Sequence, residues 1–225
     1  MEALSNLNGE RTMVITVSAC TRDNMKPEDT HAMYRLRHMV FCERLHWDVH
    51  TADGMESDEY DDLFPVYMLA RDISGKLFGC ARLLPTTGDY MLKSVFPQLL
   101  QGNPIPNAED TWELSRFAFE QSKGGEHRFS LASSHMVVEA LEFALDNNIT
   151  CYVGVTTVAF EKLLRKIGLH VKRFGPPMMV GHERSVAFSI DVTTAQLAAA
   201  RSSLLLAAQH VAPPARASQA ARVVQ

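Results

Sequence analysis

The amino-acid sequence predicts an α/β or α+β fold with three layers around a mixed, twisted sheet. Its 225 residues, 46% of them hydrophobic, are enough for one buried core and few enough for a single domain. Short apolar runs rich in β-branched residues alternate with longer runs of helical period. Turn signals such as Ser74-Gly75 separate these runs.

Each element follows from a local pattern. The first strand is expected at Met13–Ala19, and Pro27, followed by two acidic residues, opens a helix that extends to about Leu45. The same criteria predict strands at Val66–Asp72, Lys76–Leu84, Thr111–Phe119, Thr150–Thr156, Leu169–Phe174 and Ser185–Val192, and helices at Leu131–Asn147 and Val158–Ile167. The segment Pro85–Pro106 is expected to form a loop with one helical turn near Met91–Val95.

Composition divides the chain into three parts. We expect residues 1–12 to be disordered and residues 13–192 to form the folded domain. Residues 193–225 are alanine-rich and contain no acidic residue, so we expect a tail with a helix at Thr193–His210 and disorder beyond it.

Several classes of protein are excluded at this stage. A formal net charge of −4 argues against a nucleic-acid partner. The chain has no run of about twenty apolar residues and only a thin basic face near its end, so stable membrane association is not expected. The first residues do not resemble a secretory signal, which predicts a cytoplasmic protein. Four scattered cysteines without C-x-x-C spacing predict neither a disulfide nor a metal site.

Arg37 is the first candidate for a functional residue, because it lies on the apolar side of a predicted helix. A buried guanidinium without an anion would cost about 3–5 kcal/mol, so the fold must supply a carboxylate. The acidic residues that follow are Asp48, Asp53, Glu56, Asp58, Glu59, Asp61 and Asp62. Two interpretations stay open: a solvated acidic loop with one structural ion pair, or a cleft for a charged small molecule with Phe41 and Trp47 as its aromatic wall.

Two predicted strands carry further candidates. Arg82 is either an ion-pair residue or a ligand group. In the run Trp112–Phe117, Glu113 and Ser115 share one face of an ideal strand while Arg116 points to the other. If these three side chains serve one site, a β-bulge must re-aim one of them.

The order and spacing of these motifs resemble a known family. The motifs are L-R-x-x-V-F at Leu36–Phe41, Trp47, D-G-M-E-x-D-x-Y-D at Asp53–Asp61, C-A-R-L at Cys80–Leu83, W-E-L-S-R-F at Trp112–Phe117 and V-T-T-x-x-x-E-K-L-L-R-K-I-G-L at Val155–Leu169. Together they resemble the LuxI-type acyl-homoserine-lactone synthases, the bacterial autoinducer synthases, over roughly Met13–Val192.

The resemblance implies an N-acyltransferase-like (GNAT-related) fold and synthesis of an N-acyl-homoserine lactone. S-adenosyl-methionine would be consumed as a co-substrate, with an acyl thioester as donor and no resident cofactor. The residues implied for the S-adenosyl-methionine pocket are Arg37, Phe41, Trp47, Asp58, Asp61 and Arg82, and those implied for catalysis are Glu113, Ser115 and Arg116. We take Glu113 as the candidate general base.

The acyl donor is expected to be the thioester of acyl carrier protein. Its candidate docking residues form a basic patch of Lys162, Arg165, Lys166, Lys172 and Arg173, for which a solvated helix face is the alternative. Acyl-coenzyme A is less favoured, because Glu126 interrupts the faint resemblance of Gln121-x-x-Gly124-Gly125 to a phosphate-binding loop.

Two expectations concern specificity. Gly154 falls where synthases of 3-oxoacyl signals carry a threonine, so we expect it to leave the acyl pocket without a hydroxyl and with room for bulk. The acyl chain should therefore lack a 3-oxo group. A coenzyme A-dependent N-acyltransferase of another small amine is the alternative function, and an inactive binding module is the third.

Overall fold

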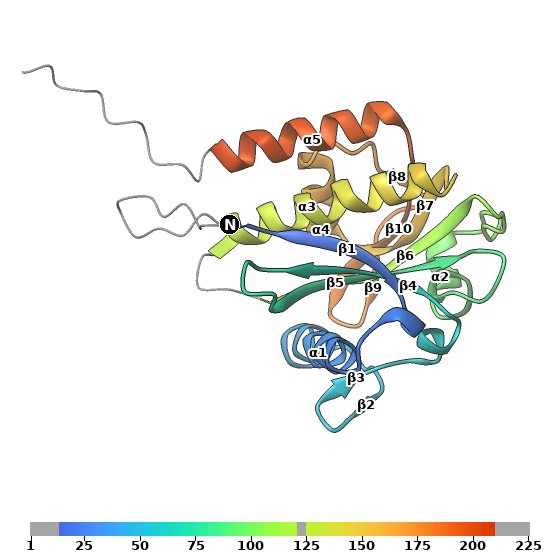
Figure 1. Ribbon diagram of the computed structural model, residues 1–225. Coiled ribbons are helices and arrows are strands. Elements are labelled where there is room, and N and C mark those ends of the chain that lie inside the picture. The colour runs from blue at the N-terminus through green and yellow to red at the C-terminus, as the bar shows by residue number, and fades with distance from the viewer. Residues whose placement is uncertain (1–13, 121–124, 210–225) are drawn as a thin grey trace, which may run out of the picture.

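The computed structural model describes residues 14–120 and 125–209, and its centre is an eight-stranded sheet (Figure 1). The strand order along the sheet is β1 (Thr16–Thr21), β4 (Val66–Arg71), β5 (Leu77–Pro85), β6 (Thr111–Phe119), β7 (Cys151–Thr157), β10 (Glu183–Asp191) and β8 (Lys172–Arg173), while β9 (Met178–Val180) also pairs with β10. Only β6 and β7 run parallel among these pairs, so the sheet is mixed as predicted.

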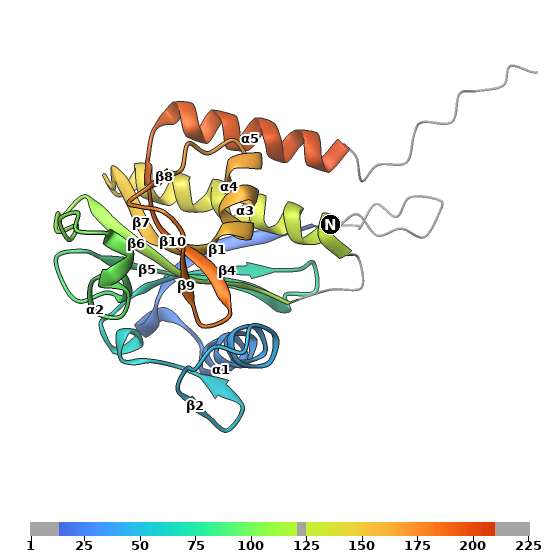
Figure 2. The ribbon, with the colours of Figure 1, turned by 180° about the vertical axis from the view of Figure 1, so that it is seen from behind.

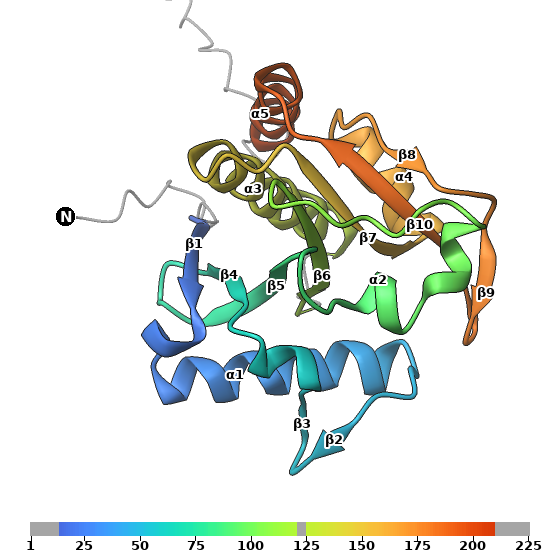
Figure 3. The same cartoon turned by 90° about the vertical axis from the view of Figure 1, so that its right-hand side faces the viewer.

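Helices cover both faces of this sheet (Figures 1 and 2). On one face lies α1 (Pro27–Arg37), which continues as a π-helix over His38–Arg44. On the other lie α3 (Gly125–Asp146) and α4 (Val158–Lys166), and α5 (Thr194–Gln209) packs against α3 (Figure 3). The short α2 (Met91–Ser94) and the 3-10 segments Arg22–Asn24, Glu59–Asp62 and Pro97–Leu100 complete the helical elements.

The C-terminal helix belongs to the compact unit. Leu197 and Ala200 of α5 are buried in the same core as Met136 and Leu141 of α3. The helix that we placed in a separate tail therefore extends the folded unit to Gln209. Residues 1–12 and 211–225, where we expected disorder, lie outside the described residues, as do Met13 and His210. None of the described helices is both long and apolar enough to span a bilayer.

The structure differs from the sequence prediction in two places: one predicted strand is shorter, and one hairpin was not predicted. The expected strand Leu169–Phe174 pairs only at Lys172 and Arg173, because Leu169 and Val171 reach the core from a loop. The acidic loop also contains a small hairpin of β2 (Thr51–Ala52) and β3 (Met55–Glu56) that we did not predict. Its turn residues Asp53 and Gly54 both have positive φ, 53° and 70°, as a tight hairpin turn requires.

The parallel pair of strands positions the site. β6 and β7 are paired from Thr111 to Glu113 against Cys151 to Val153, and neither strand ends there. Beyond this point the two strands separate, and side chains from both line one cavity.

Candidate active site

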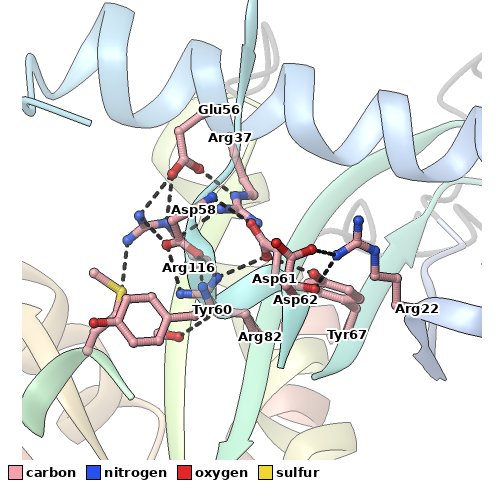
Figure 4. Close-up of polar contacts among 12 residues, drawn as sticks. Arg22, Arg37, Glu56, Asp58, Tyr60, Asp61, Asp62, Tyr67, Arg82 and Arg116 are labelled. Atoms are coloured by element: carbon pink, nitrogen blue, oxygen red, sulfur yellow. Dashed lines mark hydrogen bonds and ion pairs between the residues drawn. The ribbon is translucent and has the colours of Figure 1, made fainter. Parts of the chain in front are cut away.

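Three arginines and three carboxylates meet at the face of the sheet that α1 covers (Figure 4). Arg37 comes from α1, Arg82 from β5 and Arg116 from β6, while Glu56 ends β3 and Asp58 and Asp61 belong to the following turn. We call Arg37, Glu56, Asp58, Asp61, Arg82 and Arg116 the ion-pair network. Its three positive and three negative formal charges are matched within a mostly buried space.

Arg37 has two strong partners. Its Nε donates to Glu56 Oε2 at 2.5 Å and its Nη1 donates to Asp61 Oδ1 at 2.8 Å. Asp58 Oδ2 lies 3.9 Å from Arg37 Nη2, close enough for attraction but too far for a hydrogen bond. The sequence predicted that the acidic residues after Arg37 would supply its carboxylate partner; the structure confirms this and identifies the partners as Glu56 and Asp61.

Arg82 binds the turn that follows. Its Nη1 and Nη2 both donate to the Asp58 carboxylate, the latter at 3.0 Å, and Nη1 reaches Asp61 Oδ1 at 2.9 Å. The Asp58 side chain also accepts from Tyr60 N while Asp61 accepts from Asp58 N, which forms a capping box on the 3-10 segment. Asp58 and Asp61 therefore bind the arginine side chains and also accept hydrogen bonds from backbone N–H groups of their own 3-10 segment.

The electrostatics of Asp61 follow from these contacts. Burial alone would raise the pKa of the Asp61 carboxyl, but the charges of Arg37 and Arg82 outweigh it and hold the pKa well below its usual range. Tyr67 donates its hydroxyl to Asp61 Oδ1 at 2.7 Å. Burial and the Asp61 charge raise the pKa of Tyr67, so this hydroxyl stays a donor.

A β-bulge at Arg116 brings the three β6 candidates together. Cys80 faces Ala118 and Arg82 faces Ser115, so β6 carries one more residue than β5 over this interval. Arg116 has φ of 52°, a left-handed conformation that costs a non-glycine residue about 1–3 kcal/mol. Its Nη2 donates to Glu56 Oε1 at 2.9 Å and to Asp58 Oδ2 at 2.8 Å. The bulge that sequence analysis required is confirmed.

Glu113 is 1% exposed and contacts the backbone of α2. Its Oε2 accepts from Met91 N at 3.1 Å and its Oε1 accepts from Leu92 N at 2.7 Å. Burial raises the pKa of Glu113 above its ordinary value, although these amides and the nearby arginines oppose the shift. The carboxylate anchors the start of α2.

A cavity of about 540 Å³ lies beside Glu113. Glu113, Ser115 and Arg116 line it, and so do Phe41 and Trp47, whose rings stack at 5.2 Å between centroids. Further apolar and aromatic walls come from Val40, Met91, Phe96, Phe117, Phe129, Phe160, Leu163 and Phe188. Of the ion-pair network only Arg116 is part of this lining, so its other members lie behind the cavity wall.

Gly154 does not lie in the cavity wall. A Cβ atom built on it would come within 2.5 Å of Leu114 O and 3.2 Å of the Phe188 ring. The expectation of extra room for acyl bulk is therefore wrong at this position, because the neighbouring strand fills the space. Val155, Thr156 and Thr157 of the same strand do line the cavity.

The five basic candidates for carrier docking separate into two groups. Arg165 and Arg173 both bind the Glu161 carboxylate, at 2.9 Å and 2.5 Å, and Lys172 lies 2.5 Å from Asp191 Oδ2. Lys162 and Lys166 instead line the cavity.

Sequence analysis missed several residues of the site. Glu56 stands inside the D-G-M-E motif, but nothing local distinguishes it from its acidic neighbours. Met91 places Sδ 3.0 Å from Arg116 Nη1, and Arg44 lines the cavity from the π-helix; both positions depend on tertiary contacts. Residues 121–124, part of the segment considered as a phosphate-binding motif, lie outside the described residues. No cluster of described His, Cys, Asp or Glu side chains is arranged to hold a metal ion.

The chain has an N-acyltransferase-like (GNAT-related) fold. The solved structure of FeeM, an N-acyl amino acid synthase from uncultured soil microbes, shares the fold at a TM-score of 0.52 and 16% identity, over 85% of this chain and 98% of that one. The crystal structure of the AHL synthase LasI matches at a TM-score of 0.79 and 40% identity, over 84% of this chain and 96% of that one. The structure of BjaI, a CoA-dependent acyl-homoserine lactone synthase with SAM and isopentyl-CoA, matches at a TM-score of 0.75 and 27% identity. The match covers 85% of this chain and 90% of that one.

Sequence comparison leads to the family. The autoinducer synthase profile matches residues 21–200. An acyl-homoserine-lactone synthase of Pseudomonas aeruginosa is 44% identical over 162 residues, which are 71% of this chain and 81% of the relative. The chain belongs to the autoinducer synthase family, and it is an acyltransferase of the acyl-homoserine-lactone synthase type.

Proposed function

We propose that this enzyme acylates the amine of S-adenosyl-methionine from an acyl thioester and then closes the lactone with release of methylthioadenosine. The observation that carries the proposal is the placement of Glu113, Ser115 and Arg116 in the wall of one aromatic cavity. The related synthase BjaI has been solved with SAM and an acyl-coenzyme A, which supports the same substrate classes here.

The cavity suits the charges of the acceptor. S-adenosyl-methionine carries a sulfonium and an ammonium, and the stacked rings of Phe41 and Trp47 offer aromatic faces to such cations. Arg116 also lines the cavity; its Nε and Nη2 bind Glu56 and Asp58, so we assign its Nη1, which contacts Met91 Sδ, to the acceptor carboxylate. Asp58 and Asp61 bind arginines and stand behind the wall, so we assign them to positioning rather than to contact with the acceptor.

The chemical steps follow from this arrangement. The acceptor amine gives up a proton and attacks the thioester carbonyl, the amide forms, and the thiol of the donor leaves. The acceptor carboxylate then displaces the neutral thioether at the carbon next to the sulfonium. This second step is intramolecular and needs little acid–base help.

Glu113 is the proposed base, directly or through a water. Glu113→Gln keeps the shape of the side chain and removes its ability to accept a proton, so we expect the acylation rate to fall about 10²–10⁴-fold. Because the pKa of Glu113 is raised, the acidic limb of the wild-type rate profile should lie above the ordinary glutamate pKa of about 4.3.

The control for this variant is its thermal midpoint. The amide still accepts from one of the two α2 amides, so Glu113→Gln should remain folded. Near-normal turnover in the folded variant would rule out the role of base.

We propose acyl carrier protein as the preferred donor. The support is the location of Lys162 and Lys166 at the cavity, since an acidic carrier would be steered to them. The ratio of kcat/KM for matched acyl-carrier and acyl-coenzyme A thioesters tests this preference. A higher value for coenzyme A would contradict it and place the enzyme with CoA-dependent relatives such as BjaI.

We propose that the acyl chain lacks a 3-oxo group, because the family resemblance aligns Gly154, which has no hydroxyl, with the threonine of 3-oxoacyl synthases, although Gly154 itself lies outside the cavity wall. Thr156, two residues along β7, lines the cavity and does carry one. Mass spectrometry of culture extract from a host that expresses the chain identifies the product. Mainly 3-oxo product would overturn the proposal, and the product spectrum of Thr156→Val would then show whether this hydroxyl selects it.

A further inference from the structure

The central sheet ends in two edge strands of different character, β1 and β8 (Figure 3). β8 has only two residues, Lys172 and Arg173, and both bind carboxylates of their own chain. Short length and charged side chains are two of the ways in which proteins keep an edge strand from pairing with another chain. The β8 edge is thus protected against further pairing.

β1 lacks these protections. Its six residues, Thr16–Thr21, include no charged residue and no proline, and its register with β4 is continuous, without a bulge. Every second residue of an antiparallel edge strand directs its backbone N–H and C=O away from the sheet. Among the described residues, the backbone of β1 forms no hydrogen bond outside its pairing with β4. The outer edge of β1 is therefore open to a further strand.

Exposed apolar side chains lie at both ends of the β1–β4 pair. The register places the residues just beyond Thr16 at one end and those just beyond Thr21 at the other. Four of the nine large apolar side chains that are exposed in the described part of the chain lie at these ends, so the exposed apolar surface is concentrated beside the open edge. They are Val14 and Ile73 at the Thr16 end, and Leu63 and Phe64 at the Thr21 end.

Phe64 adds an independent observation. It precedes Pro65 and has φ of 54°, a left-handed conformation that costs a non-glycine residue about 1–3 kcal/mol. Phe64 is also 73% exposed, so packing within its own subunit does not offset this cost. Burial of the ring against another molecule would supply the missing stabilisation.

We propose that β1 pairs antiparallel with β1 of a second copy of this chain, so that the two sheets become one continuous sheet across a two-fold axis. Two observations favour a second copy over another partner. Residues near a two-fold axis meet their own copies, so a charged strand would repel itself, and β1 carries no charge. The axis also brings the apolar Thr16 end of each copy to the apolar Thr21 end of the other.

The pleat limits the register of this pairing. Opposite residues of two paired strands point to the same face of a sheet, and a two-fold axis normal to the sheet keeps the faces matched. Only registers in which one residue meets its own copy satisfy both conditions. Ser18 and Ala19 are the small, exposed residues at the centre of β1, so one of them lies on the axis. No residue of β1 lines the catalytic cavity, so the dimer leaves the cavity unchanged.

The first test compares the mass of matched variants in solution by analytical ultracentrifugation. Because six paired residues make a small interface, the wild type should shift from 25.1 kDa toward twice that mass between about 1 and 100 µM. Ala19→Lys places two like charges beside the axis and should raise the dimer Kd about tenfold or more. The control is Ala52→Lys, because Ala52 is likewise an exposed alanine of a strand, β2.

Phe64→Ser tests the apolar ends in the same experiment. It should raise the dimer Kd about tenfold, whereas Met179→Ser, which removes an equally exposed apolar side chain from β9, should leave it unchanged. The thermal midpoint and kcat/KM of Ala19→Lys show that this variant remains folded, since β1 is not part of the cavity lining.

A disulfide locates the axis. Ser18→Cys and Ala19→Cys are made separately in a Cys20→Ser background. Oxidation of the variant whose cysteine lies on the axis should give a covalent dimer, because the Cα atoms of opposite residues are about 4.5–5.5 Å apart, which is within disulfide range. Ala52→Cys in the same background should stay monomeric.

Three results would overturn the proposal. They are a wild type that stays monomeric up to about 100 µM, a dimer that a folded Ala19→Lys variant forms equally well, and the absence of a covalent dimer from both cysteine variants. In the first case, dimerisation after removal of residues 1–13 would identify the N-terminal segment as the occupant of the edge.

Discussion

The ion-pair network and the mouth of the cavity, which is lined by Arg44, Lys162 and Lys166, use cationic side chains in opposite ways. In the network, Arg37, Arg82 and Arg116 meet an equal number of carboxylates, and Arg37 is 0% exposed. At the mouth, Arg44 and two lysines meet none among the described side chains. A matched and buried charge holds structure, whereas an unmatched and accessible charge is available to a ligand.

This difference divides the family's characteristic residues by role. Arg37, Asp61 and Arg82 stand behind the cavity and fix the acidic turn against the sheet, while Glu113 and Arg116 line the cavity. A residue can therefore match the family pattern without lining the cavity.

The largest expected effect comes from breaking the network. Arg37→Ala would leave Glu56 and Asp61 buried without their main partner, so the free energy of unfolding should fall by about 3–5 kcal/mol. Arg44→Ala, the matched change at the mouth, should cost less than about 1 kcal/mol, since it removes one weak hydrogen bond. Urea unfolding measures both, and similar losses would refute the division.

Acid should weaken the network before it affects the mouth. The folded-state pKa of Asp61 is depressed, so its contribution to stability is present above the unfolded pKa of about 3.9 and is lost as pH falls through the folded pKa. The free energy of unfolding should therefore decline as pH drops below about 4. A flat profile between pH 5 and pH 2 would contradict this assignment.

The smallest effect is expected where a charge pair is largely exposed. Arg165→Ala removes one of the two arginines on Glu161 while Arg173 still binds it, so stability should change by about 0.2–1 kcal/mol. The thermal midpoint measures this change. A loss as large as that of Arg37→Ala would mean that α4 depends on its own ion pairs for folding.

Local pattern predicted most of the fold. Strand β6 has the predicted bounds Thr111–Phe119, because both its composition and its flanking turns are local signals. Strand β8 is shorter than the predicted strand Leu169–Phe174. Leu169 and Val171 are apolar because they pack in the core from a loop, and a local pattern does not distinguish this from a buried strand. The β2–β3 hairpin had a visible Asp53-Gly54 signal, which the acidic surroundings obscured.

The sequence predicted which residues belong to the site better than it predicted which of them contact each other. Periodicity identified Arg37 as a buried cation, but its choice of Glu56 over Asp58 depends on how β3 places the loop. Arg44 carries no sequence signal, because its partner Phe119 and the α4 residues that line the same cavity are distant from it in the chain. The close approach of Leu114 to Gly154 likewise arises only when two strands meet.

The bulge in β6 has a consequence for the length of the chain. A regular strand would place either Ser115 or Arg116 on the face with Glu113, and the extra residue lets both reach it. After it, Phe119 again packs with α3 and Ala118 with α1. Deleting one residue here would give a more regular sheet and an incomplete site, so folding and catalysis favour different lengths for the same strand.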